Sequence, residues 1–174
     1  MAYAEMLELD RRQPRRVYGA SEPASGGSHH ATPGAASFLA YLGAAPLLAA
    51  ALLMIADPMN AAAESFLILY GAALIIFFGG VRWGVAVMKP NGPTPRALLG
   101  AGLPMMFALP LFAAGEATLK MIAIMAFMIV LLIDDLNATR RGDGAPAWYL
   151  GVRIPLTVLI EVAFLVALAA GARG

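Results

Sequence analysis

The side chains of this chain that could do chemistry are few, and they lie within or beside long apolar segments. Arg82, Asp134 and Arg153 all fall within roughly 10 Å of one membrane surface, at 1.5 Å per helical residue. Ionisable groups at such depths are the first candidates for a functional site in a bilayer protein. Two interpretations stay open: a cluster that binds a ligand or moves protons, or arginines that reach the headgroups while Asp134 ends a helix.

Three aromatic side chains, Trp83, Trp148 and Tyr149, are expected at the same depth, where membrane proteins carry an aromatic belt. We expect Asp134 to face Arg82, Arg153 or both, because all three charges share one level. Two arginines against one aspartate leave a surplus positive charge, which Asp135 could neutralise. A structural role and a ligand site are both compatible with this set of residues.

Glu161 differs from the cluster because it lies near the middle of the last apolar segment. Tyr149, Arg153, Thr157 and Glu161 recur every four residues and therefore share one helix face. Such a polar stripe must face protein or water rather than lipid. A proton relay would need polar groups at this depth on other segments, so the sequence favours a helix–helix hydrogen bond or a subunit contact for Glu161.

Small residues repeat at a spacing of four within the apolar segments. Gly80 and Gly84 form a GxxxG pattern, and Ala163, Ala167 and Gly171 form a similar series. Small side chains at this spacing allow helix backbones to approach closely. Prolines within the segments should kink or break the helices locally; they are Pro46, Pro104, Pro110 and Pro155.

The composition fixes the class of protein more firmly than the motifs do. Of 174 residues, 60% are hydrophobic and 13% are charged, whereas a soluble domain has roughly a quarter charged residues. There is no cysteine, and His29 and His30 lie in the polar N-terminal stretch. The sequence thus predicts no cofactor, no metal site and no enzyme activity, and a net charge of +1 gives no reason to expect a nucleic-acid partner.

The apolar segments predict an all-α membrane protein, a bundle of about five transmembrane helices at residues 37–174. A span requires about 20 predominantly apolar residues. Before the bundle, residues 1–36 form a polar tail in which Ala2–Arg12 is either a short amphipathic helix or disordered. The predicted spans are 38–56, 65–88, 97–114, 118–133 and 149–171.

Basic residues in the loops set the orientation of such a bundle. With five spans, the tail, the second loop and the fourth loop share one side. That side carries Arg11, Arg12, Arg15, Arg16, Lys89, Arg96, Arg140 and Arg141. The opposite side carries only Lys120 and Arg173. The N-terminus is therefore expected in the cytoplasm and the C-terminus on the far side.

Three strings together resemble a known family. They are Tyr41-Leu-Gly-Ala-Ala-Pro46, Tyr70-Gly71 through Phe78-Gly-Gly-Val-Arg-Trp-Gly84, and Pro146-Ala-Trp-Tyr-Leu-Gly-Val-Arg-Ile-Pro-Leu-Thr157. The chain is similar to the membrane family catalogued as domain of unknown function 3429, which includes transmembrane protein 69. The resemblance covers roughly residues 38–170 and implies the fold but no particular activity.

The function expected from the sequence is that of a non-catalytic inner-membrane protein, an accessory subunit or assembly factor of a larger complex. The membrane would be the bacterial inner membrane, or the mitochondrial inner membrane in a eukaryote, with lipids and a protein as partners. The alternatives are a small transporter or channel-like protein, or an anionic lipid-binding protein, using Arg82, Asp134 and Arg153.

Overall fold

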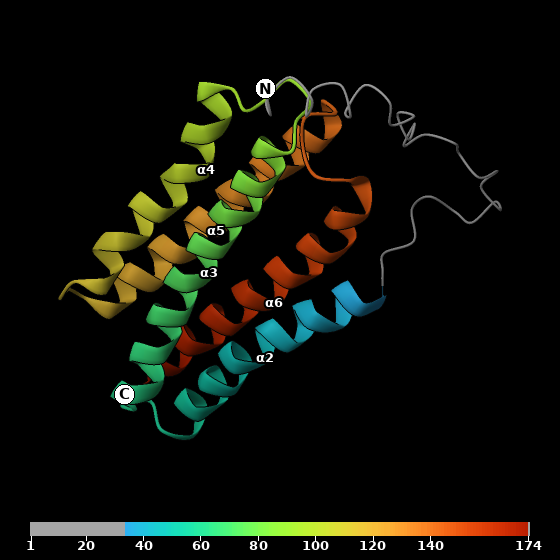
Figure 1. Cartoon of the computed structure of the whole chain (residues 1–174). Coiled ribbons are helices and arrows are strands. Elements are labelled where there is room, and N and C mark those ends of the chain that lie inside the picture. Colours follow the sequence, from blue (N-terminus) through green and yellow to red (C-terminus); the bar gives the residue numbers. More distant parts are fainter. Residues whose placement is uncertain (1–33, 174) are drawn as a thin grey trace, which may run out of the picture.

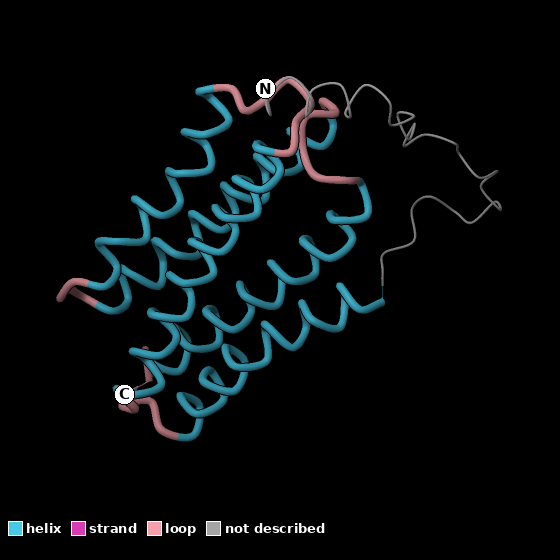
Figure 2. The backbone as a smooth tube through the Cα atoms, viewed as in Figure 1, coloured by secondary structure: helices cyan, strands magenta, loops and turns pink. Residues whose placement is uncertain are grey.

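A computed structural model describes residues 34–173, and every regular element within this range is helical (Figures 1 and 2). In chain order the elements are α2 (Gly34–Ala56), α3 (Ala61–Val87), α4 (Pro95–Ala108), the 3-10 helix η1 (Leu109–Phe112), α5 (Ala117–Arg140) and α6 (Ala147–Gly171). Counting α4 with η1, this range holds five helices long and apolar enough to cross a membrane. The all-helical, five-span prediction is confirmed. The hypothesis for Ala2–Arg12 concerns residues outside the described range.

Helix starts are set by capping side chains that lie just outside the apolar runs. The side chain of Asn60 accepts a hydrogen bond from the backbone N–H of Ala63, so α3 begins at Ala61 rather than at the expected residue 65. Thr94 and Glu116 cap α4 and α5 in the same way. The capping residues therefore make the helices start earlier than the apolar segments alone would indicate.

Helix α5 does not end at Asp134, as the sequence had predicted, but continues to Arg140. The helix then terminates in a tight reversal in which Gly142 has φ of +74°, a conformation that favours glycine. The backbone N–H groups of Asp143 and Gly144 both donate to the carbonyl of Ala138. The loop after α5 is therefore folded back onto the last helical turn.

The third span is helical through Pro104 but changes character at Pro110. Regular α-helix ends at Ala108, and the chain completes one 3-10 turn before the loop. Proline cannot donate the backbone hydrogen bond that an α-helix needs at that position. The expected break therefore occurs at Pro110, while Pro104 is accommodated within α4.

Helix α3 is the centre of the bundle, since α2, α4 and α5 all pack against it (Figure 1). Its glycines allow this crowding. A Cβ atom at Gly71 would lie 2.7 Å from the Cζ atom of Phe164, and one at Gly79 would lie 2.9 Å from the carbonyl oxygen of Ala101. Close helix approach thus occurs at Gly71 and Gly79.

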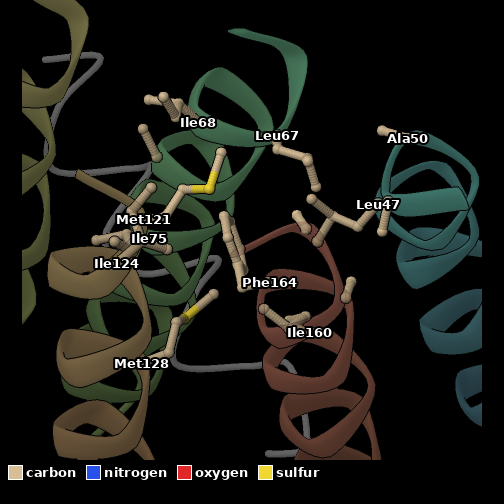
Figure 3. Close-up of a cluster of buried hydrophobic side chains, with 14 of the residues drawn as sticks. Leu47, Ala50, Leu67, Ile68, Ile75, Met121, Ile124, Met128, Ile160 and Phe164 are labelled. Carbon is tan, nitrogen blue, oxygen red and sulfur yellow. The ribbon is translucent and has the colours of Figure 1, made fainter. Parts of the chain in front are cut away.

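The core is a continuous apolar cluster shared by α2, α3, α5 and α6, and Figure 3 shows Phe164 at its centre. Phe164 is fully buried between α3 and α5, and Ile124 and Met128 of α5 are equally inaccessible. Helix α2 packs mainly on α6, where Ala163 and Ala167 are fully buried. The alanine series in α6 therefore forms a helix contact inside the chain.

Candidate functional site: an interfacial charge cluster

The charged residues of the bundle meet where α3 and α5 end and α6 begins. Arg82 lies in the last turns of α3, Arg153 in the second turn of α6, and Asp134 and Asp135 in the second half of α5. Because α3 and α5 run in the same direction and α6 runs antiparallel to both, these positions come to one depth. We call Arg82, Asp134, Asp135 and Arg153 the interfacial charge cluster.

Asp135 is the centre of the interfacial charge cluster because it binds both arginines. Its Oδ1 atom lies 2.9 Å from Nε and from Nη2 of Arg82, and its Oδ2 atom lies 3.2 Å from Nε of Arg153. Arg82 also donates to the backbone carbonyl of Leu131 at 2.8 Å. One carboxylate therefore ties α3, α5 and α6 together.

Asp134, the residue singled out from the sequence, has the lesser role. Its Oδ2 atom lies 2.9 Å from Nη1 of Arg82, and no pairing with Arg153 occurs. The side chain of Asp134 is 59% exposed, against 11% for Asp135. The structure thus brings Asp134 to one of the two expected arginines and gives Asp135 the bridging position.

Lys120, Phe127 and Asp134 recur every seven residues, and this spacing predicts that Asp134 points toward the core with Phe127. Phe127 does pack against the core, but the side chain of Asp134 is 59% exposed. The buried face of α5 consists of Met121, Ile124, Met128 and Leu131. Steps of three and four residues continue this face to Asp135 and leave Asp134 beside it. The signal that could have identified Asp135 was this spacing, which is hard to see when nearly every neighbour is apolar.

Arg153 is completely buried and is held by several contacts at once. Its Nη1 atom donates to Oγ1 of Thr157 at 2.8 Å, and the Thr157 hydroxyl donates to the carbonyl of Arg153. Its guanidinium carbon lies 3.4 Å from the centroid of the Phe78 ring, a cation–π contact. Among residues 34–173, its Nη2 atom has no hydrogen-bond partner.

The three aromatic residues expected near the cluster have different surroundings. Trp83 is 51% exposed on the outside of α3, as an interfacial belt residue would be. Trp148 and Tyr149 are partly buried and pack edge to face, with ring centroids 6.4 Å apart. Only Tyr149 also lines the cleft described next.

A cleft of about 420 Å³ opens beside the interfacial charge cluster. It lies between the end of α3, the start of α4, the end of α5 and the α5–α6 loop. Its polar lining includes Arg82, Asp134, Asp135, Lys89, Arg96 and Arg141. In the described part of the chain, no group of three or more His, Cys, Asp or Glu side chains could hold a metal ion. The lining has four basic and three acidic side chains, which favours an anion or an ion-paired network.

Glu161 is not part of the interfacial charge cluster. Both its carboxylate oxygens are shielded from solvent, and neither has a hydrogen-bond partner among residues 34–173. Thr157, one turn earlier, is engaged with Arg153. The intramolecular helix–helix hydrogen bond considered for Glu161 is therefore not formed within the described bundle.

The pair Gly80 and Gly84 does not mediate helix packing within the described chain. A Cβ atom at either position would meet nothing within 4 Å, unlike one at Gly79 or Gly71. The neighbouring α4 approaches α3 at Gly79 instead, one residue away. A contact of Gly80 and Gly84 with a partner protein stays a prediction.

Five helices long and apolar enough to cross a membrane, three of them joined at one end by an ionic cluster, define a multi-pass α-helical membrane protein. The chain belongs to the family described as Protein of unknown function (DUF3429), whose model matches residues 32–169. This match confirms the resemblance carried by the three sequence strings. No curated protein and no solved structure matches the chain.

Proposed function

We propose that this protein is a non-catalytic subunit or assembly factor of a larger complex in the bacterial inner membrane, or in the mitochondrial inner membrane of a eukaryote. The observation that carries the proposal is Glu161. It lies near the middle of α6, and its carboxyl group has no donor or acceptor within residues 34–173. A polar group without a hydrogen-bond partner in hydrocarbon is unfavourable by several kcal/mol.

The surroundings of Glu161 indicate where a partner helix would lie. Val158, Val162 and Leu165 on the same side of α6 are each more than two-fifths exposed. At helical spacing they flank Glu161 and form an apolar strip with one polar group in it. Both oxygens are shielded in the chain alone, so the Glu161 side chain would turn toward this strip to bond with a serine, threonine, asparagine or glutamine of a partner helix at this depth. Lipid tails offer no such donor.

Photo-crosslinking in the native membrane tests this proposal. A benzophenone side chain introduced at Leu165 should form a covalent adduct with a second polypeptide, whose mass distinguishes it from a lipid adduct. The same side chain at Ile129, on the exposed side of α5, should not form this adduct. Glu161→Gln should keep the adduct because the amide retains hydrogen-bonding ability, and Glu161→Leu should weaken it. Equal adducts from Leu165 and Ile129, or adducts containing only two copies of this chain, would contradict an accessory role.

A small transporter or channel-like protein is the second candidate function. The observation favouring it is that the cleft reaches Asp135, which holds the buried Arg153 with its unpartnered Nη2 atom. Arg153 in turn contacts the Phe78 ring. Reconstituted vesicles containing the purified protein would release a trapped anion under this hypothesis and would retain it under the leading one.

The cytoplasmic position of the N-terminus belongs to the same proposal. It is supported by the excess of basic residues at the loop ends where the interfacial charge cluster and the cleft also lie. Reporter fusions at the two chain termini test it. A cytoplasmic signal at the N-terminus and an external signal at the C-terminus are expected, and the reversed pair would refute this orientation.

A further inference from the structure

The cleft beside the interfacial charge cluster carries more positive than negative charge. Its lining includes four basic side chains, Arg82, Lys89, Arg96 and Arg141, and three acidic ones, Asp134, Asp135 and Asp143. Behind the lining, Arg153 shares Asp135 with Arg82. Five cations are therefore opposed by three carboxylates in one small region.

The pairing within the cleft shows which cations are available to a ligand. Arg82 is bound by both aspartates and by the Leu131 carbonyl. Lys89 has only a long contact, 3.5 Å, with Asp143, which is 67% exposed. Arg96 and Arg141 form no salt bridge with any residue of the described range, although both line the cleft.

Each of these two exposed arginines lies at a helix end beside the cleft. Arg96 lies in the first turn of α4, which Thr94 caps. Arg141 directly follows α5, where Gly144 packs so closely that an added Cβ would lie 2.7 Å from the backbone nitrogen of Thr139. The walls of the cleft are therefore built from capped helix ends rather than from extended loop.

The other part of the lining is apolar and comes from α3 and α4. Val81 and Val85 of α3 and Ala97 and Gly100 of α4 contribute to it. A cleft with both basic and apolar lining matches a molecule with an anionic head, and arginine forks fit phosphate oxygens in a two-point contact. Basic clusters at the cytoplasmic surface are attracted to anionic lipid headgroups.

We infer that the cleft is a binding site for a phosphate group, with Arg96 and Arg141 as its principal contacts and Lys89 as a third. The interfacial charge cluster forms the floor of this site, and its arginines are already neutralised, so the ligand charge is balanced by the walls. The site does not depend on the proposed subunit role. The phosphate can come from an anionic phospholipid or from solution, and the test separates the two sources.

Native mass spectrometry of the purified full chain provides the test. Phosphatidylglycerol and phosphatidylcholine are titrated against the wild type, the double variant R96Q/R141Q and the matched control R140Q/R173Q. The control removes the same charge from two exposed arginines outside the cleft. Each cation near the surface contributes about a fivefold change in affinity, so the double variant should bind phosphatidylglycerol roughly 25-fold more weakly.

The wild type and the control should bind phosphatidylglycerol equally and more tightly than phosphatidylcholine. R96K/R141K, which keeps the charge but loses the planar fork, should give intermediate affinity. Inorganic phosphate that displaces the lipid assigns the site to soluble phosphate, and lipid that resists displacement assigns it to the headgroup. The inference is overturned if the wild type binds neither, or if R96Q/R141Q weakens binding no more than the control.

Discussion

Two adjacent aspartates on α5 should differ sharply in their contribution to stability. Removal of the Asp135 side chain leaves Arg153, fully buried, with Thr157 and the Phe78 ring as its only side-chain partners among residues 34–173. Loss of one partner of a buried ion pair typically destabilises a protein by 3–5 kcal/mol, because an uncompensated charge is left behind. Asp134→Ala removes an exposed partner of Arg82, and exposed ion pairs contribute about 0–1 kcal/mol.

The assay is the free energy of unfolding in detergent micelles, measured by titration with dodecyl sulfate and followed by helical circular dichroism. We expect Asp135→Ala to lose about 3–5 kcal/mol, Asp135→Asn to lose less because the amide oxygen still accepts hydrogen bonds, and Asp134→Ala to stay within about 1 kcal/mol. Replacing Arg153 by Met in the Asp135→Ala background should recover part of the loss, since no buried charge remains. A loss from Asp134→Ala as large as that from Asp135→Ala would refute the bridging role.

Three further predictions concern packing, hydrogen bonding and pH. Gly71→Ala should destabilise the bundle by about 1–3 kcal/mol through its contact with the core, while Gly80→Ala, in open space, should be neutral or slightly stabilising in the same unfolding assay. Tyr70→Phe should lose about 0.6 kcal/mol with its hydrogen bond to the α2 backbone, whereas Tyr41→Phe, half exposed, should not. The backbone N–H of Leu119 donates to Glu116 and holds the pKa of that carboxyl below its usual value. The cap formed by Glu116 therefore stabilises α5 at neutral pH, and this stabilisation is lost as the pH falls below about 4. Glu116→Gln should remove this pH dependence of unfolding. Equal slopes against pH for Glu116→Gln and the wild type would contradict the cap.

The five spans were predictable because each needs only a sufficient length of apolar sequence, and length and hydropathy are read directly from the residues. The limits of the predicted spans also gave the depth of Arg82 and Arg153 in the membrane. Their shared partner was harder to identify. Depth alone allows either Asp134 or Asp135, and the choice between them depends on which way α5 is rotated.

Helix rotation is poorly encoded in a membrane sequence because residues that face lipid are as apolar as residues that face the core. In α5, the exposed side chains of Ile129 and Val130 are as apolar as the buried side chains of Met128 and Leu131. For the same reason the pattern Gly80–Gly84 looked like a packing motif although the close approach lies at Gly71 and Gly79. Only contacts with neighbouring helices fix the rotation.

Helix ends were predicted less accurately for a different reason. Hydropathy locates the end of an apolar run. A helix instead ends where its backbone N–H and C=O groups no longer find partners within the helix. Polar residues after Asp135 continue α5 to Arg140, and Asn60 starts α3 ahead of its apolar run. Ala138 and Thr139 in the extension of α5 line the candidate cleft, so hydropathy could not have revealed it.

The position of Asp135 on the helix before Arg153 also bears on how the chain enters the membrane. An arginine at the centre of an isolated span opposes insertion by about 2.5–3.5 kcal/mol, and Arg153, nearer the interface, opposes it by less. Here the carboxylate is synthesised first, and only the loop 141–146 separates α5 from α6. The two helices can therefore leave the translocation channel as a hairpin whose charges are already paired. Loss of Asp135 should accordingly reduce the amount of α6 that integrates during synthesis, before the stability of the finished bundle has any influence.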